Sequence, residues 1–245
     1  MRLPQILDWT RRHQPDILAI QETKVQDAQF PVDPIRENGY QVAFRGQKSH
    51  AGVAVLSRHP LEEVHFGFDD EPRDEARMIR FRVLGIPIVN TYVPQGRAID
   101  SPQFEYKLEW LARLGDLFAR CYDPQAPLLW VGDLNVAPEP IDLHNPKRNE
   151  NHVCFHSSVR AALEHIRDWG FIDLFRLHHP DEPGHYTFWD YRVRNALDRN
   201  LGWRVDHIWA TASLAQRCKA CWIDVEARRA PRPSDHTFLV ADFSF

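Results

Sequence analysis

The sequence has no apolar run of roughly 18 residues or more, the length at which a segment becomes a candidate membrane helix. Basic residues are not in excess either, since 30 Lys and Arg stand against 34 Asp and Glu, for a formal net charge of −4. We therefore expect a soluble, cytoplasmic monomer with no membrane partner. Any surface that attracts a polyanion must be local, because the molecule as a whole does not attract one.

Cysteine is scarce, and of the four cysteines only Cys218 and Cys221 form a Cys-x-x-Cys motif. No second pair and no histidine pattern follows them, so ordinary, partly buried thiols are favoured over a zinc or redox site. Internal repeats, low-complexity tracts and linkers are also absent. A length of 245 residues with 43% hydrophobic residues suits a single domain over 1–245.

Short apolar runs of strand length dominate what is present, interrupted by a few amphipathic segments. The apolar spacing predicts helices over 3–10, 102–121 and 159–169. Strands are expected over 16–20, 53–56, 79–83, 86–93, 128–131, 203–210 and 237–243. No long helix separates the three strands between residues 53 and 93, so we expect them to pair antiparallel. Strand groups broken by a few helices favour an α+β sandwich of two sheets.

Acidic residues end or interrupt four of these apolar segments: Glu22, Asp133, Asp206 and Asp235. An acid next to a buried strand is costly unless it is paired or bound to a metal ion, and hard cations such as Mg²⁺ take oxygen ligands. Taken singly, each acid also fits a turn or helix-cap residue, and His236 beside Asp235 fits an ordinary surface histidine. Four such acids are more than chance core residues explain, and they suit the carboxylate site that metal-assisted cleavage of a phosphodiester needs.

Polar motifs follow one another in a fixed order: Gln21-Glu22-Thr23-Lys24, Tyr92-Val93-Pro94-Gln95-Gly96, Gly132-Asp133-Leu134-Asn135, Arg204-Val205-Asp206 and Ser234-Asp235-His236. In this combination the sequence resembles the exonuclease III family of apurinic/apyrimidinic (AP) endonucleases, within the endonuclease/exonuclease/phosphatase superfamily. The resemblance implies a four-layered αββα sandwich of two mostly antiparallel sheets flanked by helices. It also implies a Mg²⁺-dependent, or Mn²⁺-dependent, DNA repair nuclease. Such an enzyme cuts double-stranded DNA 5′ to abasic sites and trims 3′ ends.

The resemblance assigns metal binding to four positions, Glu22, Asp235, Asp133 and Asn135. Glu22 is the principal metal carboxylate and Asp235 a second acidic contributor. Asp133 positions and deprotonates the attacking water, and Asn135 holds that water or a phosphate oxygen.

Three further residues receive catalytic roles from the same resemblance. Asp206 orients and charge-stabilises His236, whose imidazolium faces the phosphate as it gains charge. Tyr92 donates from its phenol to a phosphate oxygen or assists the leaving oxygen.

Substrate contacts are expected from two groups of side chains. Lys24 and Arg77 match phosphate-contacting positions, although a solvated surface charge explains each about as well. Aromatic clusters occur over 186–192 and 202–205, and such clusters are more often core than ligand contacts. The resemblance nevertheless matches Phe188, Trp203 and Val205 to the pocket that receives the base-less sugar. Trp189 either joins them or packs behind them.

The resemblance begins at the first helix, so the strand with an Asn-x-Asn or Asn-x-Asp motif that opens family members is not matched. We expect the single domain over 1–245 to lack that strand and an asparagine near the metal. Two alternatives to a DNA repair nuclease stay open. One is a catalytically impaired nucleic-acid-binding regulator of the same fold, and the other is a phosphodiesterase that acts on a small phosphoester.

Overall fold

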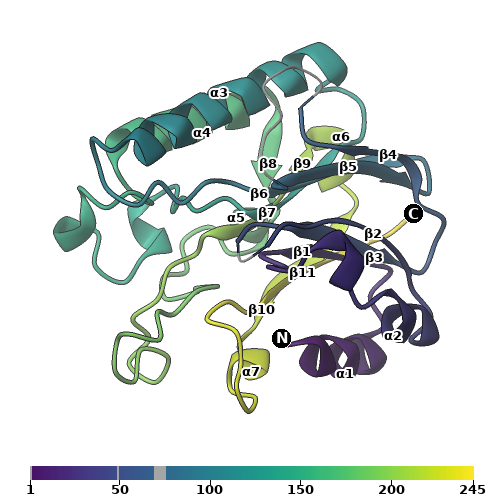
Figure 1. Ribbon diagram of the computed structural model, residues 1–245. Helices are drawn as coiled ribbons and strands as arrows, with labels where there is room; N and C mark the ends of the chain where they lie inside the picture. Colours follow the sequence, from purple (N-terminus) through teal and green to yellow (C-terminus); the bar gives the residue numbers. More distant parts are fainter. Residues whose placement is uncertain (1, 49, 69–75) are drawn as a thin grey trace. The chain divides into compact units, whose positions relative to one another are not determined.

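The computed structural model describes residues 2–48, 50–68 and 76–245. They fall into two compact units, which are described separately here. Unit 1 comprises the described residues of Met1–Tyr92 together with Leu129–Gly132, and unit 2 comprises Val93–Leu128 and Asp133–Phe245. Figure 1 traces the helices and strands in chain order.

Unit 1 contains most of the short strands. Its elements are α1 (Leu3–His13), β1 (Ile17–Gln21), the 3₁₀ helix η1 (Asp27–Gln29), α2 (Val32–Glu37), β2 (Gln41–Arg45), β3 (Val53–Ser57), β4 (Glu62–Phe66), β5 (Met78–Val83), β6 (Ile86–Tyr92) and β7 (Leu129–Asp133) without its last residue. The helix predicted over 3–10 is thus confirmed and runs one turn further. It ends where Gln14 adopts a left-handed conformation with φ 47° and donates its backbone N–H to Thr10 O at 2.9 Å.

The strands of unit 1 form two antiparallel groups. In the first group β3 pairs antiparallel with β1 and β2, and in the second β5 pairs antiparallel with β4 and β6. β7 is the neighbour of β6 on its other edge. The predicted antiparallel pairing is therefore confirmed for β5 and β6 but is wrong for β3. All five residues of β3 are buried, as suits a strand paired on both edges, whereas the more polar β4 takes the outer position beside β5.

A buried asparagine links the two groups of strands in unit 1. Asn90 on β6 donates from Nδ2 to Ile20 O at 3.3 Å and to Ala54 O at 3.1 Å, and its Oδ1 accepts from Gln21 Nε2 at 2.7 Å. Because all three partners lie on β1 or β3, this side chain fixes where β1 ends relative to β6. The end of β1 is where Glu22 follows.

Unit 2 contains the two longest helices and the last four strands. Its elements are α3 (Pro102–Cys121), the 3₁₀ helices η2 (Pro140–Asp142) and η3 (Lys147–Asn149), α4 (Ser157–Asp168), β8 (Phe171–Asp173), α5 (Leu174–His178), β9 (Asp206–Thr211), α6 (Ala212–Ala215), β10 (Cys218–Asp224), α7 (Val225–Arg228) and β11 (Phe238–Phe243). β8 pairs antiparallel with β9, and β10 pairs antiparallel with β11.

Helix α3 confirms the prediction over 102–121. Ser101 caps it by accepting the backbone N–H of Phe104 on its hydroxyl at 3.2 Å, and Pro102 suits the first turn because its missing N–H has no partner there. α3 and α4 lie side by side, and the buried face of α3 carries Trp110, Leu114 and Phe118 (Figure 1). The packing of α3 beside α4 therefore buries apolar side chains within unit 2.

The structure also describes the cysteines and the apolar character of the helices. All four cysteines are free thiols, and three of them are buried. Burial raises the pKa of the Cys221 thiol above its usual range. Over residues 2–48, 50–68 and 76–245, no helix is long and apolar enough to cross a membrane.

Candidate active site

In unit 1 the predicted site residues gather around Glu22, directly after β1. The Tyr92 hydroxyl donates a short hydrogen bond to Glu22 Oε1, and Lys24 Nζ lies 2.9 Å from Glu22 Oε2. Glu22 and Lys24 both have positive φ, 54° and 53°, a conformation that costs a non-glycine residue roughly 1 kcal/mol or more. Backbone bonds from Thr23 and Lys24 to the carbonyls of Gly52 and Ala51 hold this turn in place.

Arg77 stands against the ring of Tyr92. Its guanidinium carbon lies 4.7 Å from the ring centroid, and its Nη1 donates to Tyr92 O at 3.3 Å. The two residues also share the backbone bond from Tyr92 N to Arg77 O at 2.7 Å. The structure therefore brings together Glu22, Lys24, Tyr92 and Arg77, and it makes Arg77 a neighbour of the tyrosine phenol rather than an isolated surface charge.

The motif Gly132-Asp133-Leu134-Asn135 requires glycine at its first position. It has φ +137°, and a Cβ atom at this position would lie 1.9 Å from the carbonyl oxygen of Thr91 on β6. Only glycine permits so close an approach of β7 to β6. The residue that follows it, Asp133, is the last of β7, as predicted from the end of the apolar run.

In unit 2 Asp133 and Asn135 form a closed pair. Asp133 Oδ1 accepts the backbone N–H of Asn135 at 2.9 Å, and Asp133 Oδ2 accepts from Asn135 Nδ2 at 3.1 Å. The same Nδ2 donates to Val93 O at 3.0 Å, and Asn135 takes φ 49°, a region that asparagine tolerates better than most residues. Asp133 is 4% exposed and Asn135 9%, so both side chains are fixed before any ligand binds.

Lys107 lies beneath this pair and was missed by the sequence analysis. Its side chain is 0% exposed, and its ammonium donates to Asn135 O at 2.7 Å, to Val153 O at 2.8 Å and to Gln95 O at 3.3 Å. Burial lowers the pKa of Lys107, while Cys154 and Asp133 act in the opposite direction. A signal for it exists in the sequence, since Lys107 falls on the apolar stripe of α3, three residues after Phe104 and four before Leu111.

Asp206 and His236 form the second pair of unit 2. His236 Nδ1 lies 2.8 Å from Asp206 Oδ2, and both side chains are partly exposed, His236 at 25% and Asp206 at 15%. Burial works to lower the pKa of His236. The negative charge of Asp206 and its hydrogen bond, with further contributions from Asp133 and Asp235, outweigh burial and raise the pKa of His236 to about 10. His236 therefore carries a positive charge at neutral pH, and Nδ1 is the donor.

The two pairs meet in unit 2. Ligand-type atoms of Asp133, Asp206 and His236 all lie within 4.8 Å of one another. The negative charge of Asp235 also helps to raise the pKa of His236, so Asp235 lies near these groups. The backbone O of Asp235 accepts from Trp189 N at 2.9 Å. Carboxylates, one amide and one imidazolium thus line a small polar site.

The predicted aromatic residues separate into two groups. Phe188 is half-buried and packs on the His236 ring with 4.9 Å between centroids, and it exchanges two backbone hydrogen bonds of 2.9 Å with Trp203. Trp203 and Val205 are 8% and 4% exposed and lie two residues apart, on the same side of their extended segment. Trp189 is 1% exposed and belongs to a core cluster with Tyr186 and Ala196. Trp189 is therefore a core residue of unit 2.

A buried ion-pair network supports the segment that leads into Asp206. Arg204 is 0% exposed, its Nε donates to Asp142 Oδ1 at 2.8 Å, and its Nη2 lies 2.8 Å from Asp173 Oδ2. Arg176 Nη2 donates to the same Asp142 oxygen at 2.6 Å. Burial raises the pKa of the Asp142 and Asp173 carboxyls, but the two arginines and His207 overcome it, so both pKa values are below the usual range.

Comparison with known proteins gives consistent results along the whole chain. A family model described as "Endonuclease/Exonuclease/phosphatase family" matches residues 3–236. The chain is 32% identical to "Exodeoxyribonuclease III" of Haemophilus influenzae over 95% of this chain and 91% of that protein.

Two solved structures share its fold. An AP endonuclease from Archaeoglobus fulgidus superposes with TM-score 0.97 at 48% identity, covering 100% of this chain and 95% of the other. The 3′ phosphatase NExo from Neisseria, bound to a product DNA hairpin, superposes with TM-score 0.92 at 35% identity, again over 100% and 95%. The predicted α+β sandwich fold class is therefore confirmed.

Proposed function

The chain belongs to the endonuclease/exonuclease/phosphatase family, and from this premise we propose that it is a DNA repair nuclease acting on abasic sites and 3′ ends. It would hydrolyse the phosphodiester 5′ to an abasic site in duplex DNA and trim blocked 3′ ends. Relatives named as exodeoxyribonuclease III and AP endonuclease, and a DNA-bound 3′ phosphatase of the same fold, support this assignment.

The meeting of Asp133, Asp206 and His236 within 4.8 Å is the observation that carries the proposal. Hydrolysis of a phosphodiester requires a base for the attacking water and a positive group for the charge that develops on phosphate. Asp133 is the base in this assignment, and Asn135 holds the water or a phosphate oxygen. His236, kept charged by Asp206 at 2.8 Å, faces the phosphate. An inositol or lipid phosphodiesterase would need the same groups, so the substrate class rests on the family relatives.

Members of this family depend on a divalent metal ion, and we propose Mg²⁺, with Mn²⁺ as a substitute. The residues that the resemblance assigns to the metal suit a hard cation, because each offers oxygen ligands: Glu22 in unit 1, and Asp133, Asn135 and Asp235 in unit 2. Glu22 already accepts a cationic partner, Lys24 at 2.9 Å, on the carboxylate oxygen Oε2. When bound, such an ion neutralises charge on the phosphate and lowers the pKa of a coordinated water.

The groups around Glu22 in unit 1 are proposed to contact phosphate as well. Tyr92 donates from its phenol, and Arg77 is held against the Tyr92 ring with a guanidinium carbon 4.7 Å from its centroid. Lys24 supplies a second positive charge. These contacts are sequence-independent, as suits a repair enzyme that must act at any position in DNA.

Phe188, Trp203 and Val205 are proposed to receive the abasic sugar. They are apolar and adjacent, and Phe188 already touches His236. An abasic nucleotide costs little to unstack, so a small apolar pocket selects it by excluding the bulk of a base. Trp189, which is 1% exposed, would support this pocket from the core rather than contact the substrate.

A nicking assay tests the proposal. A duplex containing one tetrahydrofuran abasic analogue is incubated with the protein and Mg²⁺, and strands are resolved by length. We expect cleavage 5′ to the analogue, its loss in EDTA, and its abolition by Asp133→Asn and by His236→Ala with an unchanged melting temperature.

Other outcomes point to the alternative functions. Tight duplex binding without cleavage in either Mg²⁺ or Mn²⁺ would replace the nuclease with a nucleic-acid-binding regulator. Hydrolysis of an inositol phosphate with the DNA left intact would identify a small-phosphoester phosphodiesterase. Removal of a 3′ phosphate without nicking would restrict the activity to 3′ ends.

A further inference from the structure

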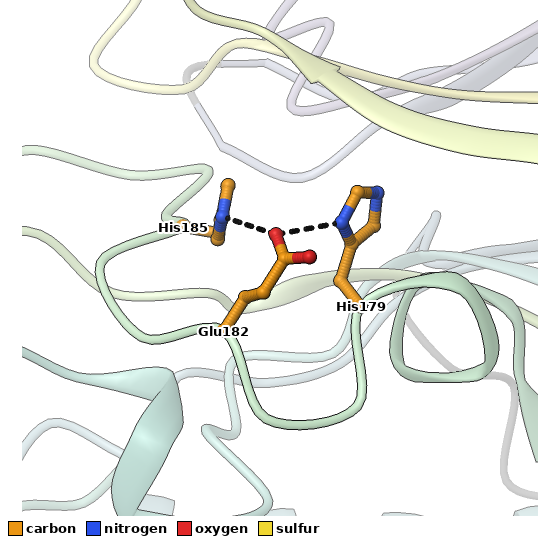
Figure 2. A group of neighbouring side chains, drawn as sticks. All are labelled: His179, Glu182 and His185. Atoms are coloured by element: carbon orange, nitrogen blue, oxygen red, sulfur yellow. Dashed lines mark hydrogen bonds and ion pairs between the residues drawn. The ribbon is translucent and has the colours of Figure 1, made fainter.

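A second group of potential metal ligands lies on the loop that follows α5, outside the residues assigned to catalysis. His179 Nδ1 lies 2.9 Å and His185 Nε2 3.1 Å from the same oxygen of Glu182, Oε2. Figure 2 shows the carboxylate between the two imidazoles, with both contacts converging on that oxygen. The three ligand atoms all lie within 4.8 Å of one another. We propose that this loop binds a zinc-class transition-metal ion through His179, Glu182 and His185.

The two contacts of the His179 ring leave a place for a metal ion beside Nδ1. Its Nε2 lies 2.9 Å from the backbone O of Cys221, and because a carbonyl only accepts, Nε2 must carry a proton. In the neutral ring Nδ1 then presents a lone pair, and it faces the carboxylate oxygen of Glu182, which is also an acceptor. Two acceptors at 2.9 Å need a proton or a metal ion between them.

The arrangement is the one that metal-binding histidines usually have. A ligating imidazole commonly donates its other N–H to a backbone carbonyl, which fixes the tautomer and the ring orientation. Phe175, 1% exposed, adds a second constraint by packing on His179 at 4.6 Å and on His185 at 5.5 Å between centroids. Both rings are therefore oriented by groups other than Glu182.

The backbone of the loop is fixed as well. Arg176 Nη1 donates to His179 O and to Glu182 O, each at 3.0 Å, so one guanidinium holds two of the three ligand-bearing residues. Nη2 of the same guanidinium donates to Oδ1 of the buried Asp142 at 2.6 Å. A site whose backbone is set beforehand loses less entropy when it binds an ion.

Ligand types and spacing select the class of ion. Two imidazole nitrogens and a carboxylate are the ligands of open zinc sites, whereas Mg²⁺ and Ca²⁺ take oxygen. Ligand atoms about 2.1 Å from one ion are separated by roughly 3.0 Å at right angles and 3.4 Å in a tetrahedron, close to the contacts described above. Three protein ligands leave room for water on the exposed side of Glu182.

The bound ion would act on the loop rather than on the phosphodiester. The loop runs directly into Tyr186–Trp189, and Phe188 in that segment packs on His236. Zinc would therefore stabilise unit 2 and hold this segment in place. At about 100 times its dissociation constant it is expected to raise the melting temperature by about 5 to 10 °C.

Zinc titration of the metal-free protein tests the site. The whole chain is stripped with EDTA and dialysed, and ZnCl₂ binding is measured by calorimetry, with the number of ions per chain counted. Zinc can also occupy the catalytic carboxylates, so the comparison is between variants. His185→Ala and Glu182→Gln should each lose one bound ion, or bind it at least about 10-fold more weakly, and lose the zinc-dependent rise in melting temperature.

His165→Ala is the matched control, because it removes an exposed histidine on α4 in the same unit. It should retain the wild-type number of ions. Nicking by all three variants in Mg²⁺ alone should equal that of the wild type, which establishes that they are folded. If His185→Ala and Glu182→Gln bind as many zinc ions as the wild type with the same affinity, the site does not exist, and His179 carries a second proton instead. That result would leave the proposed nuclease activity untouched.

Discussion

Replacement of Arg204 by methionine should lower the free energy of unfolding by about 3 to 5 kcal/mol at pH 7, because it leaves buried carboxylates without their cation. The Arg204 side chain is 0% exposed and lies 2.8 Å from both Asp142 and Asp173. After the substitution Asp142 keeps Arg176 at 2.6 Å. Asp173 keeps the backbone N–H groups of Phe175 and Arg176, but its nearest basic side chain is then His207 at 3.8 Å. Most of the cost therefore falls on Asp173.

The magnitude follows from opposing electrostatic effects. A pair of unit charges about 4 Å apart gains roughly 4 kcal/mol at an effective dielectric constant of about 20, so the two pairs of Arg204 gain roughly 8 kcal/mol before desolvation. Burying the guanidinium costs several kcal/mol, which leaves a few kcal/mol of net stabilisation. Methionine fills much of the arginine stem, so a cavity contributes little to the loss.

The pH dependence gives the reasoning a second test. The pKa values of Asp142 and Asp173 are lower in the folded protein than in the unfolded chain. Stability from such groups is present above the unfolded pKa, near about 4, and is lost as pH falls through the folded pKa. Without Arg204 the pKa of Asp173 should rise, so Asp173 would be protonated when folded. The stability difference between wild type and variant should then shrink between about pH 7 and about pH 4.5.

Urea unfolding followed by tryptophan fluorescence measures both effects. Arg167→Met is the control, since Arg167 lies on the surface with its Nη2 2.9 Å from Glu164, and such pairs contribute roughly 1 kcal/mol or less. If Arg204→Met costs no more than Arg167→Met at neutral pH, or costs as much in the acidic buffer as at neutral pH, the network is not held together by charge.

Two further substitutions test residues around the proposed site. Lys107→Met should lower the unfolding free energy by about 2 to 3 kcal/mol, because buried carbonyls lose their donor, and should slow nicking roughly 10- to 100-fold by loosening the loop of Asn135. Urea unfolding and single-turnover nicking measure the two effects. An unchanged nicking rate would show that Lys107 does not position the loop of Asn135 for catalysis. Tyr92→Phe removes the hydroxyl bonded to Glu22 and should cost about 1 kcal/mol but slow nicking about 100-fold. Wild-type nicking by Tyr92→Phe would remove the phenol from the mechanism.

The acids of the site could be predicted from the sequence because of where they stand. Glu22 and Asp133 each follow a run of apolar residues long enough for one strand, and a carboxylate there is expensive unless it has a partner. The structure places both residues at strand ends, as expected. Pattern alone could not give the neighbours of β3, since a fully apolar strand is equally compatible with several partners in a sheet.

The contacts of Lys107 and the grouping of His179 with its neighbours could not be predicted from sequence patterns, for different physical reasons. A lysine on an apolar helix face is visible in the sequence, but its three carbonyl partners come from separate loops and have no sequence signature. His179, Glu182 and His185 have suitable spacing, yet thirteen histidines make such spacing common. Only the carbonyl of Cys221, 42 residues from His179, fixes the tautomer that makes the group informative.

The pairing of Asp206 with His236 depends on a segment that none of the polar motifs includes. Thr187 is fully buried; its hydroxyl accepts the backbone N–H groups of Val205 and Asp206, each at 3.1 Å, and its carbonyl accepts Thr237 N at 2.8 Å. One threonine thus holds the chain at Asp206 and the chain beside His236. The motifs identify the two residues, but their separation of 2.8 Å is set by the backbone bonds of Thr187. A substitution at Thr187 should therefore change the charge state of His236 although neither Asp206 nor His236 is replaced.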